Sequence, residues 1–111
     1  MVKLVILFRT GKQPVAFYNQ YNAFLMKLEE LPGLRRKAVS NVFGALGGLM
    51  PYSHIVEVTF DSREALRAAL TSPAGVEAGQ LLLRFAGADA IALYVDTMEA
   101  VFGEEPPSST T

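Results

Sequence analysis

The sequence predicts an α+β fold in which one four-stranded antiparallel sheet carries helices on one face. Four segments have strand patterns, two stretches have helical spacing of their apolar residues, and they follow in the order β-α-β-β-α-β. This order is typical of the split βαβ, or ferredoxin-like, plan. The chain has 111 residues, so we expect one domain over residues 1–102 and a disordered polar tail over 103–111.

The first strand is expected at residues 2–9. The segment VKLVILFR places apolar side chains on both of its faces, and Thr10-Gly11 follows as a turn signal. A strand that is apolar on both faces is typical of the centre of a sheet.

The first helix is expected to begin near Pro14, a residue that suits the first turn of a helix. Large apolar residues then recur at spacings of four, three, four and three, which places them on one helical face. They are Phe17, Tyr21, Phe24, Leu28 and Leu31. Pro32-Gly33 is expected to end the helix.

The next two strands are expected at residues 34–45 and 52–60. The first begins with a basic run, and the glycines and Pro51 between the two predict a hairpin loop. The second alternates in polarity, so its side chains divide between two faces. One face has His54, Val56, Val58 and Phe60, and the other has Ser53, Ile55, Glu57 and Thr59.

The remaining elements are a second helical region and a last strand. Asp61 is the expected N-cap of a helix, with Glu64 completing a capping box. Ser72-Pro73 predicts a further helical piece over residues 74–83. Residues 88–95 are the last expected strand.

Apolar residues on both faces of the strands predict a homodimer. Helices on one face leave the other uncovered, and a large exposed apolar patch is uncommon on a soluble monomer. We therefore expect two copies to pack sheet against sheet, with a sheet-face residue such as Val56 at the interface.

Composition excludes several classes of function. A formal net charge of −1 argues against a nucleic-acid partner, and the absence of cysteine excludes thiolate chemistry. A single histidine leaves no two-histidine metal site, so no metal is expected. The apolar run at residues 2–8 is too short to cross a membrane and does not form a signal peptide. We expect no membrane partner and a cytoplasmic location.

Three segments carry a resemblance to a known family: KLVILFR, LPGLRR and YSHIVEVTFDSREALRAALTSPAG. They resemble the EthD family, named for ethyl tert-butyl ether degradation, in the dimeric α+β barrel superfamily. The resemblance implies a ferredoxin-like subunit that pairs through its sheet, with a pocket between sheet and helices. It also implies a link to oxidative or xenobiotic catabolism without a cofactor, because relatives are cofactor-free monooxygenases, isomerases or decarboxylases.

The chain departs from that family at two polar positions. EthD-like chains commonly have a histidine late in the first helix, where this chain has Phe24. They often have an aspartate before the phenylalanine that corresponds to Phe85, where this chain has three leucines, 81–83. These departures favour a pocket for an apolar ligand, or a filled pocket.

His54 is the candidate for acid–base catalysis, because histidine alone has an ordinary pKa near neutrality. The alternative is a half-exposed or hydrogen-bonded histidine at a strand end. Tyr21, Phe24 and His54 are the expected substrate-binding residues, and core packing is the alternative for the first two. Glu57 is expected to pair with a basic residue of the second strand. The basic run 35–37 is either a clamp for a carboxylate or a solvated strand start.

Two function classes remain open, and a cavity distinguishes them. The first is a protein that binds or acts on a small hydrophobic compound, which requires a cavity of about 300 Å³ or more beside His54 or Tyr21. The alternative is a non-catalytic dimeric interaction module with a filled pocket. An RNA-binding module is disfavoured by the charge.

Overall fold

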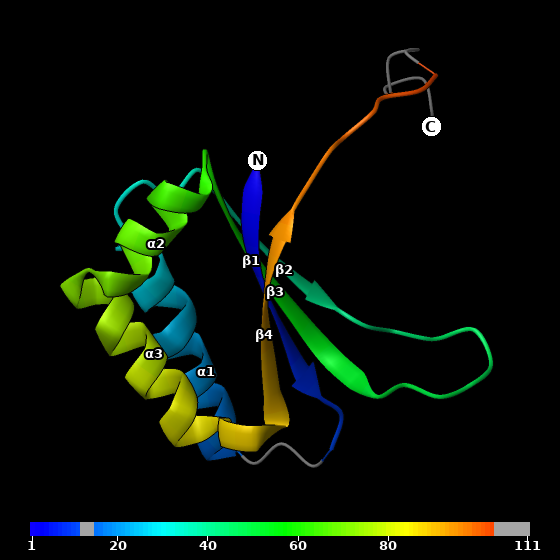
Figure 1. The fold of residues 1–111 in the computed structure, drawn as a ribbon. Coiled ribbons are helices and arrows are strands. Elements are labelled where there is room, and N and C mark those ends of the chain that lie inside the picture. The colour runs from blue at the N-terminus through cyan, green and yellow to red at the C-terminus, as the bar shows by residue number, and fades with distance from the viewer. Residues whose placement is uncertain (12–14, 104–111) are drawn as a thin grey trace.

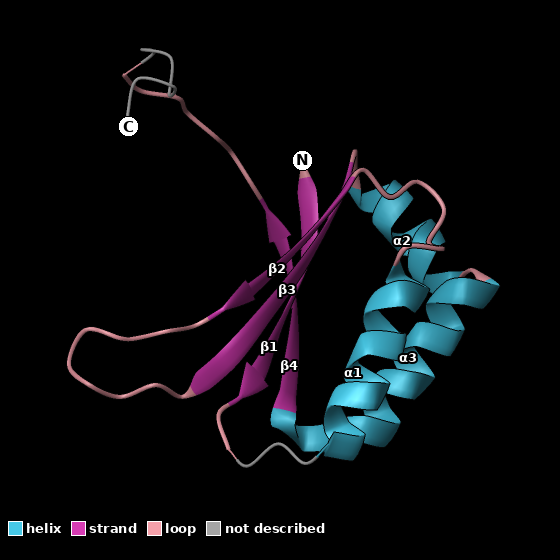
Figure 2. Ribbon diagram, turned by 180° about the vertical axis from the view of Figure 1, so that it is seen from behind, coloured by secondary structure: helices cyan, strands magenta, loops and turns pink. Residues whose placement is uncertain are grey.

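The computed structural model describes residues 1–11 and 15–103 and confirms the predicted α+β plan. The elements are β1 (Val2–Arg9), α1 (Val15–Leu28), β2 (Arg36–Asn41), β3 (Tyr52–Phe60), α2 (Arg63–Thr71), α3 (Pro73–Phe85), a 3₁₀ turn (Gly87–Asp89) and β4 (Ala90–Asp96). The strands form one antiparallel sheet in the order β2-β3-β1-β4, so β1 is central as predicted. The helices cover one face of this sheet (Figure 1, Figure 2).

Two predictions lie outside the described residues: the place of Pro14 in the first helical turn and the disorder of the tail from residue 104 onward. The hairpin loop between the second and third strands is confirmed and occupies residues 42–51. No helix in the described part of the chain is long and apolar enough to cross a membrane.

The structure corrects several predicted boundaries. Ser62, rather than Asp61, caps α2, because its extended backbone lets its hydroxyl accept a hydrogen bond from the Ala65 amide at 3.0 Å. β2 is shorter than the expected 34–45, and α1 ends at Leu28. The amides of residues 29–31 after it each donate a hydrogen bond to the carbonyl oxygen three residues earlier. α3 is longer than expected, with Ser72 as its N-cap and Pro73 in its first turn.

The helix-covered face of the sheet forms the core. Its buried strand residues are Val2, Leu4, Ile6 and Phe8 from β1 and Val56, Val58 and Phe60 from β3, packed against Tyr21, Phe24, Leu28 and Leu66. Val56 is 0% exposed beneath the helices, so its predicted place at an uncovered interface is wrong. Alternation tells which residues share a face, but it does not tell which face the helices cover.

The opposite face, which we call the open face, is also apolar. By register it presents Val5 and Leu7 of β1, Ile55 of β3, and Ile91, Leu93 and Val95 of β4. Among them lies an ion pair between Lys3 Nζ and Glu57 Oε1 at 3.2 Å. Glu57 was expected to pair with the second strand. Its partner is on β1 instead, because the β1–β3 register makes the two residues diagonal neighbours.

Candidate functional site

The space between the helices and the sheet divides into two regions that differ in how fully it is occupied. The first, the aromatic region, lies where α1 and α3 cover β1 and β3. Its rings are Phe8, Phe17, Tyr18, Tyr21, Phe24, Phe85 and His54. The Phe8 centroid lies 5.3 Å from that of Tyr21, and the Phe24 centroid lies 5.8 Å from that of Phe85. These are the separations of rings in contact, so side chains fill the space around Tyr21 and Phe24, while Phe8, Phe17 and Phe85 also border a cavity described below.

The structure brings two of the three predicted binding residues together. The Tyr21 and His54 ring centroids are 5.2 Å apart, while Phe24 is buried among core rings. His54 Nδ1 lies 2.8 Å from Ser53 Oγ. Burial lowers the pKa of His54, which favours the neutral imidazole at pH 7.

The Tyr21 hydroxyl is a buried polar group with no hydrogen-bond partner among the described residues. Burial, followed by the neighbouring Tyr18, raises its pKa, so the phenol is neutral. A buried hydroxyl without a partner destabilises a fold by about 1–3 kcal/mol. Tyr21 and His54 therefore form a neutral polar pair at the edge of an apolar layer.

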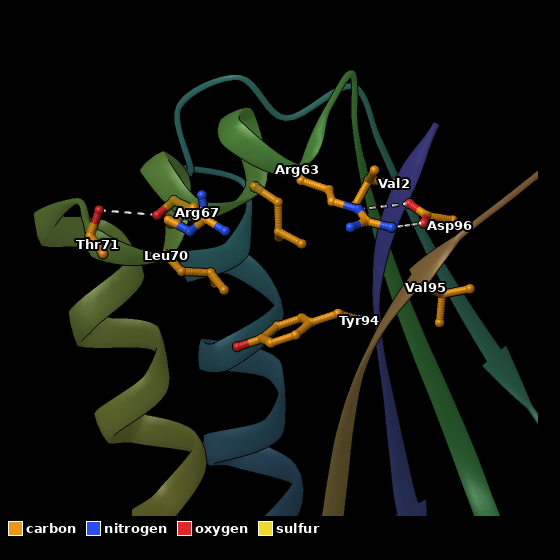
Figure 3. Close-up of a pocket in the computed structure, with 9 residues that line it drawn as sticks. Val2, Arg63, Arg67, Leu70, Thr71, Tyr94, Val95 and Asp96 are labelled. Carbon is orange, nitrogen blue, oxygen red and sulfur yellow. Dashed lines mark hydrogen bonds and ion pairs between the residues drawn. The ribbon is translucent and has the colours of Figure 1, made fainter.

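The second region, which we call the α2–β4 cavity, is hollow (Figure 3). Its volume is about 430 Å³. It is lined by Val2, Arg63, Leu66, Arg67, Leu70, Thr71, Tyr94, Val95 and Asp96. Figure 3 shows Arg63, Arg67 and Leu70 on the α2 side, with Tyr94 and Asp96 on the β4 side.

The helical period explains which α2 side chains reach the cavity. Residues 63, 66, 67 and 70 are spaced as one helical face, which places two arginines beside two leucines. The register Leu4↔Tyr94 places Tyr94 on the helix-covered face of the sheet. A close approach of α3 fixes the end of α2, since a Cβ on Gly75 would lie 2.1 Å from the Ala69 carbonyl oxygen.

The two arginines of the cavity have different partners. Arg63 binds Asp96 through two nitrogens, with Nε 3.4 Å from Oδ1, and this hydrogen bonding lowers the pKa of Asp96 and raises that of Arg63. For the Arg67 guanidinium, the described part of the chain offers no ion pair. The lining side chains thus have two positive charges and one negative charge.

A further cavity of about 480 Å³ lies beside the aromatic region. It is lined by Phe8, Arg9, Thr10, Gly11, Ala16, Phe17, Gln20, Arg84, Phe85, Ala86 and Asp89. Its wall includes Gly11, where the first described range ends. Neither of the two cavities is lined by Tyr21, Phe24 or His54.

Two members of the basic run 35–37, Arg35 and Lys37, are engaged in structural contacts. Arg35 Nε lies 3.0 Å from Asp61 Oδ1, and Lys37 binds Glu29 and the Leu25 carbonyl oxygen. These contacts favour the structural interpretation of the run over a carboxylate clamp. Within residues 1–11 and 15–103, no cluster of His, Asp or Glu side chains is arranged to hold a metal ion.

Sequence reasoning missed the α2–β4 cavity. The sequence feature that could have pointed to this cavity is the pair Arg63 and Arg67, which share a helical face with Leu66 and Leu70. That pattern marks a helix face where basic groups border apolar ones, but it does not reveal empty space next to them.

Comparisons with known proteins show which solved structures this chain resembles. No protein-family model matches the sequence, and no curated protein matches it. Among solved structures, an EthD family protein from Bacillus halodurans c-125 matches with a TM-score of 0.82 and 27% identity, over 88% of this chain and 99% of that one. The chain is EthD-like. This finding confirms the resemblance that the sequence indicates.

More distant structures share the fold of this EthD-like chain. A dimeric ferredoxin-like protein of unknown function from Thermobifida fusca is 23% identical, with a TM-score of 0.65 over 86% of this chain and 90% of that one. SnoaB, a cofactor-independent oxygenase from Streptomyces nogalater, is 16% identical, with a TM-score of 0.64 over 93% and 97%. At these identities the likeness shows the fold alone.

Proposed function

We propose that this protein binds a small, mainly apolar compound in the α2–β4 cavity. The observation that supports it is the cavity itself, whose volume of about 430 Å³ falls within the range of ligand pockets. Leu66, Leu70 and Tyr94 supply an apolar wall, and the charged groups at Arg63, Arg67 and Asp96 supply the few polar contacts that orient a ligand.

The likeness to an EthD family protein supports a role in oxidative or xenobiotic catabolism. The cytoplasmic location stays a prediction, as does binding by Tyr21, Phe24 and His54. The binding role of these residues is supported by the Tyr21 hydroxyl, because a polar ligand atom next to it would supply the hydrogen-bond partner that the described residues do not.

A variant that fills the cavity tests the proposal. Leu70→Trp puts an indole into the α2–β4 cavity, and Leu83→Trp puts the same group on an α3 position that is 72% exposed. With naphthalene-2-carboxamide as a neutral probe in calorimetry, Leu70→Trp should weaken binding by about tenfold or more, because about 1.4 kcal/mol of contact is lost. Leu83→Trp should stay within about twofold of wild type. Equal binding by both folded variants would contradict the proposal.

We also propose that two copies pair through the open face. Val5, Leu7, Ile55 and Leu93 would leave water together in that dimer. Two extended segments project away from the helices on this side, the β2–β3 loop and the segment after β4 (Figure 1). Their large apolar side chains are exposed, namely Phe43, Leu46, Leu49, Met98, Val101 and Phe102. A second copy would cover them.

Matched charge substitutions test this pairing. Leu93 on the open face is 45% exposed and Leu83 on α3 is 72% exposed, so neither is needed to fill the core. Leu93→Asp should shift the sedimentation coefficient from dimer to monomer at micromolar concentration, because it buries an unpaired charge in the interface. Leu83→Asp should leave the dimer intact. A monomeric wild type would overturn the pairing.

A non-catalytic homodimeric module is the second candidate function. The observation that favours it is the aromatic region, where rings occupy the place in which the sequence predicts a pocket. If neither naphthalene-2-carboxamide nor the corresponding carboxylate binds at millimolar concentration while the dimer is intact, this second candidate replaces the first.

A further inference from the structure

We propose that the compound bound in the α2–β4 cavity carries one carboxylate group beside its apolar part, and that Arg67 binds this carboxylate. The inference rests on the proposed function, since it names the chemical class of ligand for the same cavity. It assigns a role to a guanidinium that makes no ion pair with the described residues.

The two arginines of the cavity differ in whether their guanidinium groups are already bound to a carboxylate. Arg63 is held by Asp96, whose carboxylate accepts from two of its nitrogens, so its hydrogen-bonding fork is largely occupied. Arg67 lies one helical turn further along α2 on the same face. It lines the cavity without an ion pair in the described part of the chain, so its planar fork is available for a carboxylate.

The net charge of the cavity lining favours a ligand with a single negative charge. The lining residues Arg63, Arg67 and Asp96 give a net charge of +1. A monoanion balances it, whereas a phosphate dianion would leave an excess negative charge next to Asp96. A carboxylate also matches the planar guanidinium in shape.

The position of the charge relative to the apolar wall is a further constraint on the ligand. Leu66 and Leu70 lie on the same face of α2 as Arg67, and the Tyr94 ring reaches toward Leu70 from β4 (Figure 3). A ligand with an aromatic or aliphatic body and one acidic end would contact both kinds of surface at once. A wholly apolar ligand would use only the leucine and tyrosine contacts.

Two probes of the same shape separate charge from shape. Naphthalene-2-carboxylate and naphthalene-2-carboxamide differ in charge, and their affinities are measured by calorimetry for the wild-type protein in low salt. The carboxylate should bind about tenfold more tightly, as expected for one charge-assisted contact at a partly exposed site. Added salt should weaken binding of the carboxylate and leave the affinity for the amide unchanged.

Arg67→Gln should abolish the preference for the carboxylate while the affinity for the amide stays within about twofold. Arg67→Lys keeps the charge without the fork and should give an intermediate preference. Arg84→Gln is the matched control, because Arg84 lines the other cavity. It should behave as wild type. Thermal melts establish that each variant is folded.

The outcomes separate the two proposals. If both probes bind equally to the wild-type protein, or if Arg67→Gln and Arg67→Lys both keep the preference, the carboxylate inference is wrong and the cavity proposal stands. If neither probe binds, or Leu70→Trp leaves both affinities unchanged, the cavity proposal fails and the inference fails with it. If Arg84→Gln alone removes the preference, the carboxylate lies in the other cavity and the inference is wrong.

Discussion

The aromatic region and the α2–β4 cavity are two parts of one layer between helices and sheet, yet ring contacts close the space around Tyr21 and His54, whereas the space beside α2 is hollow. In the aromatic region, α1 contributes Phe17, Tyr21 and Phe24, and these rings meet Phe8 from the sheet. At the other end, α2 contributes two leucines and two arginines. The first region thus has large rings to fill the gap, while the second has smaller apolar groups and charged groups that stay near water.

In this fold, the buried polar groups and the charged group that can bind a ligand lie in different regions. The one histidine and the Tyr21 hydroxyl are in the aromatic region, and neither residue lines one of the two cavities. Arg67, whose guanidinium makes no ion pair among the described residues, lines the α2–β4 cavity. Substitutions in each region test whether the two regions differ in packing and stability as described.

The largest effect is expected from Phe24→Ala in the aromatic region. Phe24 is almost fully buried, so truncation should lower the free energy of unfolding by about 3–5 kcal/mol through lost contacts and a new cavity. Met26→Ala on the exposed side of α1 should change it by less than about 0.5 kcal/mol. Chemical denaturation measures both. A small effect of Phe24→Ala would mean that this region is loosely packed.

Gly75→Ala acts on the hollow region. Its Cβ would overlap the Ala69 and Leu70 carbonyl oxygens, so α2 and α3 must separate, at about 1–3 kcal/mol. Gly79→Ala meets no atom within 4 Å and should instead stabilise the fold by about 0.4–1 kcal/mol. The changes in the free energy of unfolding caused by the two substitutions should have opposite signs. Equal values would show that the helices can move apart freely.

Tyr21→Phe tests the unpartnered hydroxyl. Because its burial is uncompensated among the described residues, removal should stabilise the protein by about 1 kcal/mol in thermal or chemical unfolding. Tyr18→Phe, at a more exposed position, serves as the control and should be neutral. A loss of stability in Tyr21→Phe would indicate that a water molecule or a ligand bonds the hydroxyl, and would make the aromatic region a binding site.

A smaller, pH-dependent effect on the free energy of unfolding is expected from His54. Burial lowers its pKa in the folded state, so below the unfolded pKa of about 6.5 the unfolded chain binds more protons and stability falls. The free energy of unfolding should therefore decrease between about pH 7.5 and 5.5, and the decrease should be smaller in His54→Phe. His54 is the only histidine, which makes this window specific. The same slope in both proteins would contradict burial of the ring.

Much of the fold follows from local pattern. The apolar spacing from Phe17 to Leu31 predicts the buried side of α1, and the alternation in residues 52–60 assigns His54 and Val56 to one face. The prediction that Val56 lies at an uncovered interface failed, because either face of an apolar strand can receive the helices. Glu57 likewise found its partner on β1, since only strand pairing decides which cation is near.

The sequence by itself determined the order of elements, the residues that share each face and the stripe of rings on the first helix, because period and turn chemistry are properties of neighbouring residues. The tertiary structure decided that Tyr21 meets His54, that Arg63 is occupied by Asp96 while Arg67 lines a hollow, and that the hollow lies beside α2 and not beside α1. Empty volume is the difference between the space that distant elements enclose and the side chains that fill it, and that difference arises only when α2 and β4 pack in three dimensions.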